Sequence, residues 1–130
     1  MTTLFEIAQN WLNQDPDAET HAELTALLSA AKSGDAKAEA ELAARFDGRL
    51  QFGTAGLRGR LQAGSMGMNR VLVAQAAGGL AEYLKGYDHQ PSIVIGYDGR
   101  KNSDVFARDT AEIMAGAGIK AYLLPRKLPT

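Results

Sequence analysis

A glycine-rich stretch with two arginines, Phe52–Arg60, is the part of this sequence best suited to bind an anion. Its glycines recur at every third position, and glycine lets the backbone approach a ligand closely or adopt positive φ angles. Guanidinium groups bind phosphate through paired hydrogen bonds. Composition alone leaves two interpretations open, a phosphate site and a glycine-rich hairpin with surface arginines. The residues concerned are Gly53, Thr54, Gly56, Arg58, Gly59 and Arg60.

This stretch differs from the common nucleotide-binding loops. The Gly-Lys-Ser/Thr ending of a P-loop is missing from Phe52–Arg60. The glycine spacing is also wrong for a dinucleotide fingerprint, and no strand–helix–strand unit frames it. The stretch is therefore neither a nucleotide P-loop nor a dinucleotide-binding motif.

Asp98 and Arg100 form a second candidate site. They follow the apolar run Ser92–Tyr97 and precede a predicted helix. Ligands of open α/β sheets bind beyond the carboxyl ends of the strands, and helix N-termini favour anions. The alternative is a pairing of Asp98 with Arg100 that only shapes the turn.

Other reactive side chains support no site of their own. The hydroxyls of Thr54, Ser65 and Ser103 have no histidine near them in sequence, so spacing does not indicate a catalytic triad. His21 and His89 lie far apart in polar stretches, which disfavours a metal site. The chain has no cysteine, which excludes disulfides and thiolate metal sites.

Three amphipathic helices are predicted in residues 1–48, which we interpret as a helical N-terminal extension. Apolar residues recur at helical spacing within Phe5–Leu12, Leu24–Ala31 and Ala38–Phe46. Thr20 and Glu23 fit a capping box for the second helix. A packing layer with a solvated charged face is the simplest role for this region.

Residues 49–130 predict an α/β domain. Leu50–Ser65 reads as short extended pieces, and Asn69 is placed to cap a helix that runs to about Lys85. We expect Gly78 and Gly79 in that helix to be offset by close approach of a neighbouring element. A strand, a helix and a strand then follow, which implies a parallel pair with a right-handed crossover. The fold class is therefore layered α/β with a mixed sheet, behind the helical extension.

Composition narrows the classes of partner. Hydrophobic residues make up 45% of the chain, as in a folded globular domain, and the net charge of -1 argues against nucleic acid or an anionic membrane. No apolar run approaches the roughly 18 residues of a membrane span, and Met1–Asn10 lacks the basic start of a secretion signal. We expect a cytoplasmic protein. The sequence stops after a strand and the start of a loop, which predicts a fragment of a longer protein.

Several motifs together resemble the phosphoglucomutase/phosphomannomutase superfamily of phosphohexomutases. Phe52–Gly59 is similar to its first active-site loop, and Met68–Arg70 follows at the spacing of the longer branch of that superfamily. Ile95–Arg100, followed by Asn102–Ser103, resembles the second signature. Leu128–Thr130 is similar to the segment that leads toward the serine loop. The resemblance covers nearly the whole chain.

The resemblance implies a reaction. These enzymes transfer a phosphoryl group between an active-site phosphoserine and a sugar phosphate through a sugar bisphosphate, with Mg²⁺ at the phosphoserine. The expected activity is interconversion of the 1- and 6-phosphates of glucose or mannose, or of the 1- and 5-phosphates of a pentose. Positioning and stabilisation of oxygen charge dominate such transfers, so cationic loops suit them.

The matching positions acquire roles by the same resemblance. Arg58 would stabilise the transferring phosphoryl group, and Thr54 would lie beside the phosphoserine. The backbone of Gly53 and Gly56 would hold the loop. Asp98 and Arg100 would support phosphate or substrate binding.

Other parts of the family pattern are missing from this chain. The serine loop, the aspartate-rich Mg²⁺ loop, the sugar-selecting loop and a terminal phosphate-binding domain would all follow Thr130. We therefore expect the chain alone to be inactive, with Mg²⁺ ligands outside it and the remaining domains of a parent enzyme as its partners. Residues 62–67 depart from the pattern. The alternatives are a non-catalytic phosphate-binding module and a helical interaction domain in residues 1–48.

Overall fold

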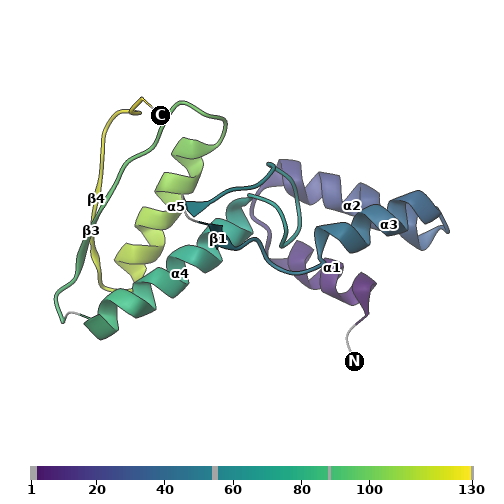
Figure 1. The fold of residues 1–130 in the computed structure, drawn as a ribbon, viewed down its shortest axis with the longest axis horizontal. Coiled ribbons are helices and arrows are strands. Elements are labelled where there is room, and N and C mark those ends of the chain that lie inside the picture. Colours follow the sequence, from purple (N-terminus) through teal and green to yellow (C-terminus); the bar gives the residue numbers. More distant parts are fainter. Residues whose placement is uncertain (1–2, 54–55, 88, 130) are drawn as a thin grey trace. The chain divides into compact units, whose positions relative to one another are not determined.

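The computed structural model describes residues 3–53, 56–87 and 89–129 and contains helices and short strands (Figure 1). The chain divides into two compact units, Met1–Leu72 and Val73–Thr130. No helix within these described ranges combines the length and apolarity that crossing a membrane requires. The helices are α1 (Leu4–Gln14), α2 (Ala18–Lys32), α3 (Ala36–Arg45), α4 (Arg70–Tyr87) and α5 (Ser103–Gly116), and the strands are β1 (Phe52–Gly53), β2 (Gly56–Leu57), β3 (Ser92–Ile95) and β4 (Lys120–Leu123).

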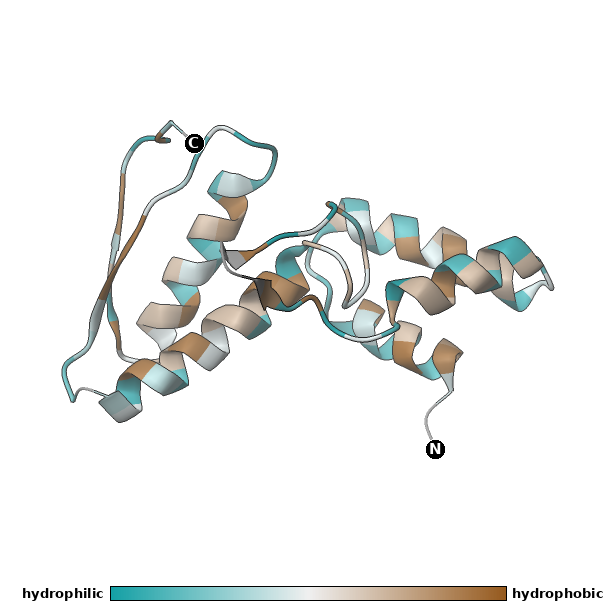
Figure 2. Cartoon of the chain, viewed as in Figure 1, coloured by the Kyte–Doolittle hydropathy of each residue, from teal (hydrophilic) through white to brown (hydrophobic). Residues whose placement is uncertain are grey.

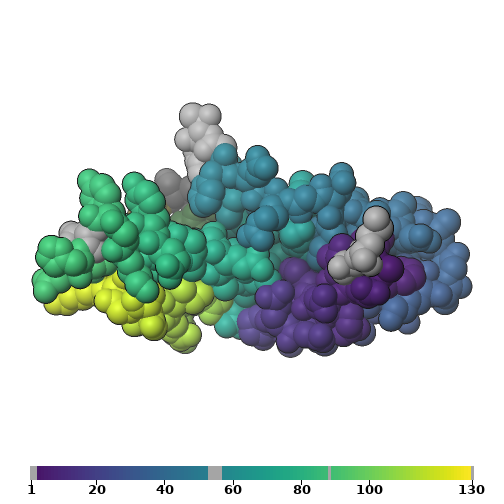
Figure 3. All heavy atoms as spheres, turned by 90° about the horizontal axis from the view of Figure 1, so that it is seen from below, coloured from purple at the N-terminus to yellow at the C-terminus, as the bar shows by residue number. Residues whose placement is uncertain are grey.

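Helices α1 to α3 pack around one apolar core in the first unit. Apolar residues alternate with polar ones along each helix, as Figure 2 shows, so each helix has one side to bury. The rings of Trp11 and Phe46 meet edge to face at 6.5 Å, and the atoms of α1 lie directly against those of the following helices in Figure 3. Full burial of a leucine contributes about 2 kcal/mol. The buried core residues of these helices are Ala8, Trp11, Leu12, Leu24, Leu28, Ala31, Ala38 and Leu42.

The start of α2 differs from the prediction. Asp17, rather than Thr20, caps the helix, and its carboxylate accepts a hydrogen bond from the Glu19 amide at 2.9 Å. Thr20 lies inside the first turn, where its hydroxyl donates to the Asp15 carboxylate at 2.7 Å. Both residues can cap a helix, and Asp17 prevails because Pro16 keeps the chain extended just before it.

The second unit contains the predicted α/β arrangement. Strands β3 and β4 pair in parallel, with Ser92 opposite Lys120 and Ile95 opposite Leu123, and α5 connects them. Met114 of α5 is fully buried, and it packs in one cluster with Ile119, which directly precedes β4. The fold class, α/β behind a helical segment, is confirmed. Among the described residues the antiparallel pair β1–β2 and the parallel pair β3–β4 form separate sheets.

The expectation for Gly78 and Gly79 is wrong. A Cβ atom built on either glycine meets no atom of the described chain within 4 Å outside the neighbouring backbone of its own helix. Both glycines therefore lower the stability of α4, and no close packing among the described residues offsets the loss. The boundary between residues 48 and 49 stays a prediction.

Candidate functional site

The glycine-rich stretch forms a short hairpin in the first unit. Phe52 of β1 pairs with Leu57 of β2, and Gly53 pairs with Gly56. Thr54 and Ala55 lie outside the described residues. Gly53 thus ends β1 and Gly56 begins β2, and the antiparallel pairing agrees with the glycine-rich hairpin that the sequence offers as one interpretation.

Arg58 directly follows β2 and has an exposed side chain. Arg60 is exposed as well, so both guanidinium groups can reach a ligand in solvent. Gly59 lies against Leu50, because a Cβ at this glycine would stand 2.8 Å from a Leu50 methyl group. Glycine at position 59 thus permits the close packing that brings the two ends of the hairpin segment together.

A loop at residues 61–69 holds both ends of the hairpin segment. On one side the amide of Leu50 donates to the Ser65 carbonyl at 2.8 Å. On the other side the Met68 amide donates to the Arg60 carbonyl, also at 2.8 Å. The loop contains residues 62–67, which depart from the family pattern, and the sequence did not predict its supporting role.

Asp98 and Arg100 meet in the second unit, at the carboxyl end of β3. The Asp98 carboxylate accepts bonds from the Arg100 Nε at 2.7 Å, the Arg100 amide at 3.1 Å and the Ser103 hydroxyl at 2.7 Å. The hydrogen bond from the Ser103 hydroxyl is the largest cause that holds the pKa of Asp98 well below its usual range. The hydrogen bonds from Arg100 are the next largest. The carboxylate is therefore charged at neutral pH and fixes the turn.

Arg100 remains accessible although Asp98 holds it. Its side chain is 73% exposed, whereas that of Asp98 is 16% exposed. The turn-shaping pair is thus present, and the guanidinium group can still face a ligand. The two interpretations of this motif are compatible.

A pocket of about 640 Å³ opens at the carboxyl ends of β3 and β4. Arg126 and Lys127 add cations to its wall, and sequence reasoning missed both. Their place directly after the strand pair is the signal that could have found them, because ligands bind at this edge of parallel sheets. The pocket is lined by Tyr97, Asp98, Gly99, Arg100, Asp104, Pro125, Arg126 and Lys127.

Backbone pairing beyond the strands forms the wall of this pocket. The Leu124 amide donates to the Ile95 carbonyl at 2.9 Å, and the Leu128 amide donates to the Tyr97 carbonyl at 2.6 Å. Gly96 permits this close approach, since a Cβ there would stand 3.1 Å from a Leu128 methyl group. The cations of the 124–128 segment are held beside the Asp98 turn as a result.

The hairpin belongs to the first unit and the pocket to the second. Each offers arginine side chains, and the pocket adds a lysine. In the described ranges, no group of three or more histidine, cysteine or acidic residues could hold a metal ion. The residues described here therefore do not fit a Mg²⁺ site, and we derive no step through the metal.

Comparison with known proteins identifies relatives of the chain. Residues 49–130 match the family model described as phosphoglucomutase/phosphomannomutase, alpha/beta/alpha domain I. A probable phosphomannomutase of Haemophilus influenzae is 94% identical over 65 residues, which are 50% of this chain and 13% of that protein. No solved structure matched.

Two further relatives have other names. A phosphoribomutase of Saccharomyces cerevisiae is 43% identical over 115 residues, covering 88% of this chain and 18% of the relative. A phosphoglucomutase of Staphylococcus haemolyticus is 45% identical over 78 residues, covering 60% and 14%. The matched part is less than a fifth of each of these three relatives. The match to the model of domain I spans both the hairpin and the pocket, and the chain belongs to the phosphoglucomutase/phosphomannomutase family.

Proposed function

We propose that this chain is the N-terminal segment of a cytoplasmic phosphosugar mutase. The parent enzyme interconverts the 1- and 6-phosphates of glucose or mannose, or the 1- and 5-phosphates of a pentose. The reaction proceeds through a phosphoserine and a sugar bisphosphate, and the serine and the Mg²⁺ ligands lie beyond this chain. The proposal is supported above all by the Phe52–Arg60 hairpin within the family match.

The residues of this chain bind and orient the phosphoryl group. Arg58 places its guanidinium group on the transferring oxygens, where charge accumulates, and Thr54 supplies a hydroxyl beside it. Gly53 and Gly56 keep the backbone of the hairpin free of side chains at its turn. Asp98 fixes Arg100, which contributes to phosphate binding.

Replacement of Arg58 tests this role in the complete enzyme. We expect Arg58→Ala to lower kcat about 100-fold or more, as loss of one transition-state donor does in other enzymes. Arg49→Ala removes an exposed arginine nearby and should change kcat less than about threefold. A near-wild-type rate for Arg58→Ala would remove Arg58 from the site.

A non-catalytic phosphate-binding module is the second candidate. The pocket of the second unit favours this candidate, because this chain alone supplies three cations that could bind phosphate. These cations are Arg100, Arg126 and Lys127. The module would bind a sugar bisphosphate without the rest of a mutase. Calorimetry of the 130-residue chain that detects no heat at millimolar sugar bisphosphate would count heavily against it.

A further inference from the structure

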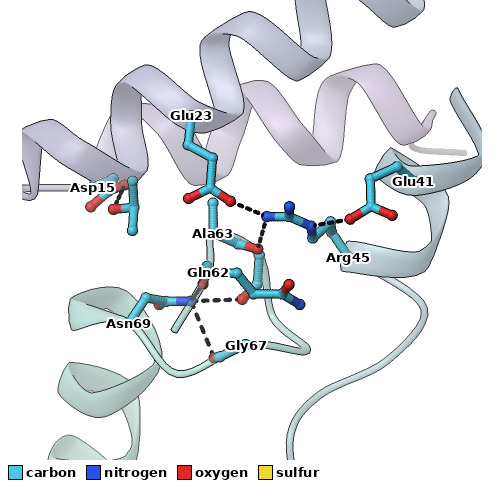
Figure 4. A network of polar contacts seen from close by, with 10 residues as sticks. Asp15, Glu23, Glu41, Arg45, Gln62, Ala63, Gly67 and Asn69 are labelled. Atoms are coloured by element: carbon cyan, nitrogen blue, oxygen red, sulfur yellow. Dashed lines mark hydrogen bonds and ion pairs between the residues drawn. The ribbon is translucent and has the colours of Figure 1, made fainter. Parts of the chain in front are cut away.

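Arg45 joins three elements of the first unit at the end of α3 (Figure 4). Its Nε donates to Glu41 of the same helix at 2.8 Å, and its Nη1 donates both to Glu23 of α2 and to the Ala63 carbonyl. Burial opposes the charge on Arg45, but the bonds to these glutamates outweigh it and raise the pKa of the guanidinium group. Its side chain is only 13% exposed, so most of this arginine is covered by its neighbours.

The loop that Arg45 contacts is organised around Asn69. The Asn69 Nδ2 atom donates to the carbonyls of Gln62 and Gly64, both at 2.8 Å, and to that of Gly67 at 3.2 Å. Its Oδ1 accepts from the Leu72 amide at 2.9 Å, which caps α4 as the sequence predicts. One buried side chain therefore binds the loop together and begins the next helix.

The backbone of the loop lies directly on Arg45. The Met66 amide donates to the Arg45 carbonyl at 3.1 Å. Gly64 has a φ of +103°, and a Cβ there would stand 2.6 Å from the same carbonyl oxygen. The end of α3 and the 61–69 loop are in contact through both backbone and side chain.

This loop in turn holds the hairpin segment on both sides. The bonds from Leu50 to Ser65 and from Met68 to Arg60 anchor the residues before β1 and after β2. A strand pair of two residues each cannot maintain its own shape, because isolated hairpins are marginal even when longer. The hairpin therefore depends on the loop, and the loop depends on Arg45.

We propose that Arg45 is a positioning residue through which the packed helices α1 to α3 hold the phosphate-binding hairpin in place. The inference rests on the proposed function in one respect, namely that the hairpin binds phosphate. A binding site gains affinity when its groups are already ordered. Loss of the Arg45 contacts should therefore weaken phosphate binding, although every side chain that contacts the phosphate is still present.

The test uses amide hydrogen exchange and phosphate titration of the whole chain, both read by NMR. In Arg45→Met we expect exchange of the Leu50 and Met68 amides to rise about tenfold, the scale of a charge-assisted hydrogen bond. The apparent Kd for inorganic phosphate at the hairpin should rise by about the same factor. Exchange of the Leu28 amide, in the core of α2, should stay at its wild-type rate.

Three variants separate positioning from charge and from general stability. Arg49→Met removes an equal charge nearby and should leave all three amides unchanged. Glu41→Gln breaks only the pair within α3 and should also leave them unchanged. Glu23→Gln breaks the pair between α2 and α3 and should raise exchange of Leu50 and Met68 about threefold. If Arg45→Met does not fold, the exchange rates in Glu23→Gln test the positioning role of Arg45 instead.

The proposal is overturned if exchange of the Leu50 and Met68 amides stays within twofold of wild type in both Arg45→Met and Glu23→Gln. It is equally overturned if Leu28 exchange rises as much as theirs, because Arg45 would then only support the fold. If the wild-type chain binds no phosphate, the hairpin's assigned function fails. The exchange data still decide whether Arg45 orders the hairpin.

Discussion

Asp98 orders the turn at the edge of the parallel strands, and its charge makes that order dependent on pH. Its folded pKa lies well below the usual value, so the carboxylate stabilises the fold above about pH 4. That contribution is lost progressively as the pH falls below about 4 toward the lower folded pKa. The sequence predicted this pair as one of two interpretations, because Asp98 and Arg100 carry opposite charges two positions apart between a strand and a helix.

Asp98→Asn should show this dependence directly. The variant should have a lower Tm than wild type at pH 7, because the amide carries no charge for Arg100. The gap in Tm should narrow as the pH falls below about 4, because the Asp98 carboxylate then becomes protonated in the unfolded wild-type chain. Thermal melts across that range measure it, with Asp47→Asn as an exposed control. A gap that stays constant with pH would show that the charge of Asp98 contributes nothing.

An isosteric substitution separates the two roles of Asn69, which are to cap α4 and to bind the carbonyls of the 61–69 loop. Asn69→Asp keeps an oxygen for the Leu72 amide but turns the donor toward three carbonyls into an acceptor. We expect a loss of about 3 kcal/mol in the free energy of unfolding, since a buried polar group loses its partners. Urea denaturation measures it, and Asn13→Asp on the exposed side of α1 should cost less than about 1 kcal/mol. A similar cost in both variants would contradict the role of Asn69 in the loop.

Among the elements, the helices were the most predictable part of the chain. Their apolar residues recur at helical spacing over two turns or more, and Gly34 and Gly118 take positive φ where the helices end. The 61–69 loop could not be predicted, because its shape comes from Asn69 and from the distant Arg45. Residues so far apart in sequence give no local signal.

Gly64 tests how tightly that loop sits on α3. Gly64→Ala should lower the free energy of unfolding by about 2 to 5 kcal/mol, from a strained positive φ plus overlap with the Arg45 carbonyl. Gly34→Ala is the matched control, with a φ of +97° and open space around the position. It should cost only about 1 kcal/mol. Equal costs in urea denaturation would mean that the loop is not packed against Arg45.

For the molecule as a whole, the sequence predicted the class of fold and the two motifs better than it predicted their surroundings. The strand–helix–strand unit and the hairpin lie where the apolar runs and glycines placed them. The sequence pattern did not identify Arg126 and Lys127, because they line a pocket only through their position at the edge of the β3–β4 sheet. Residues 49–130, which include both motifs, match the family model for domain I.

Phosphoryl transfer by the complete enzyme that carries this chain tests the central claim most directly. The enzyme would be mixed with glucose, mannose or ribose 1-phosphate, Mg²⁺ and a trace of the matching bisphosphate, and followed by ³¹P NMR. We predict conversion of at least one substrate to its 6- or 5-phosphate, with a kcat on the order of 10 s⁻¹. Absence of conversion for all three substrates, with folded enzyme, would contradict a phosphosugar mutase.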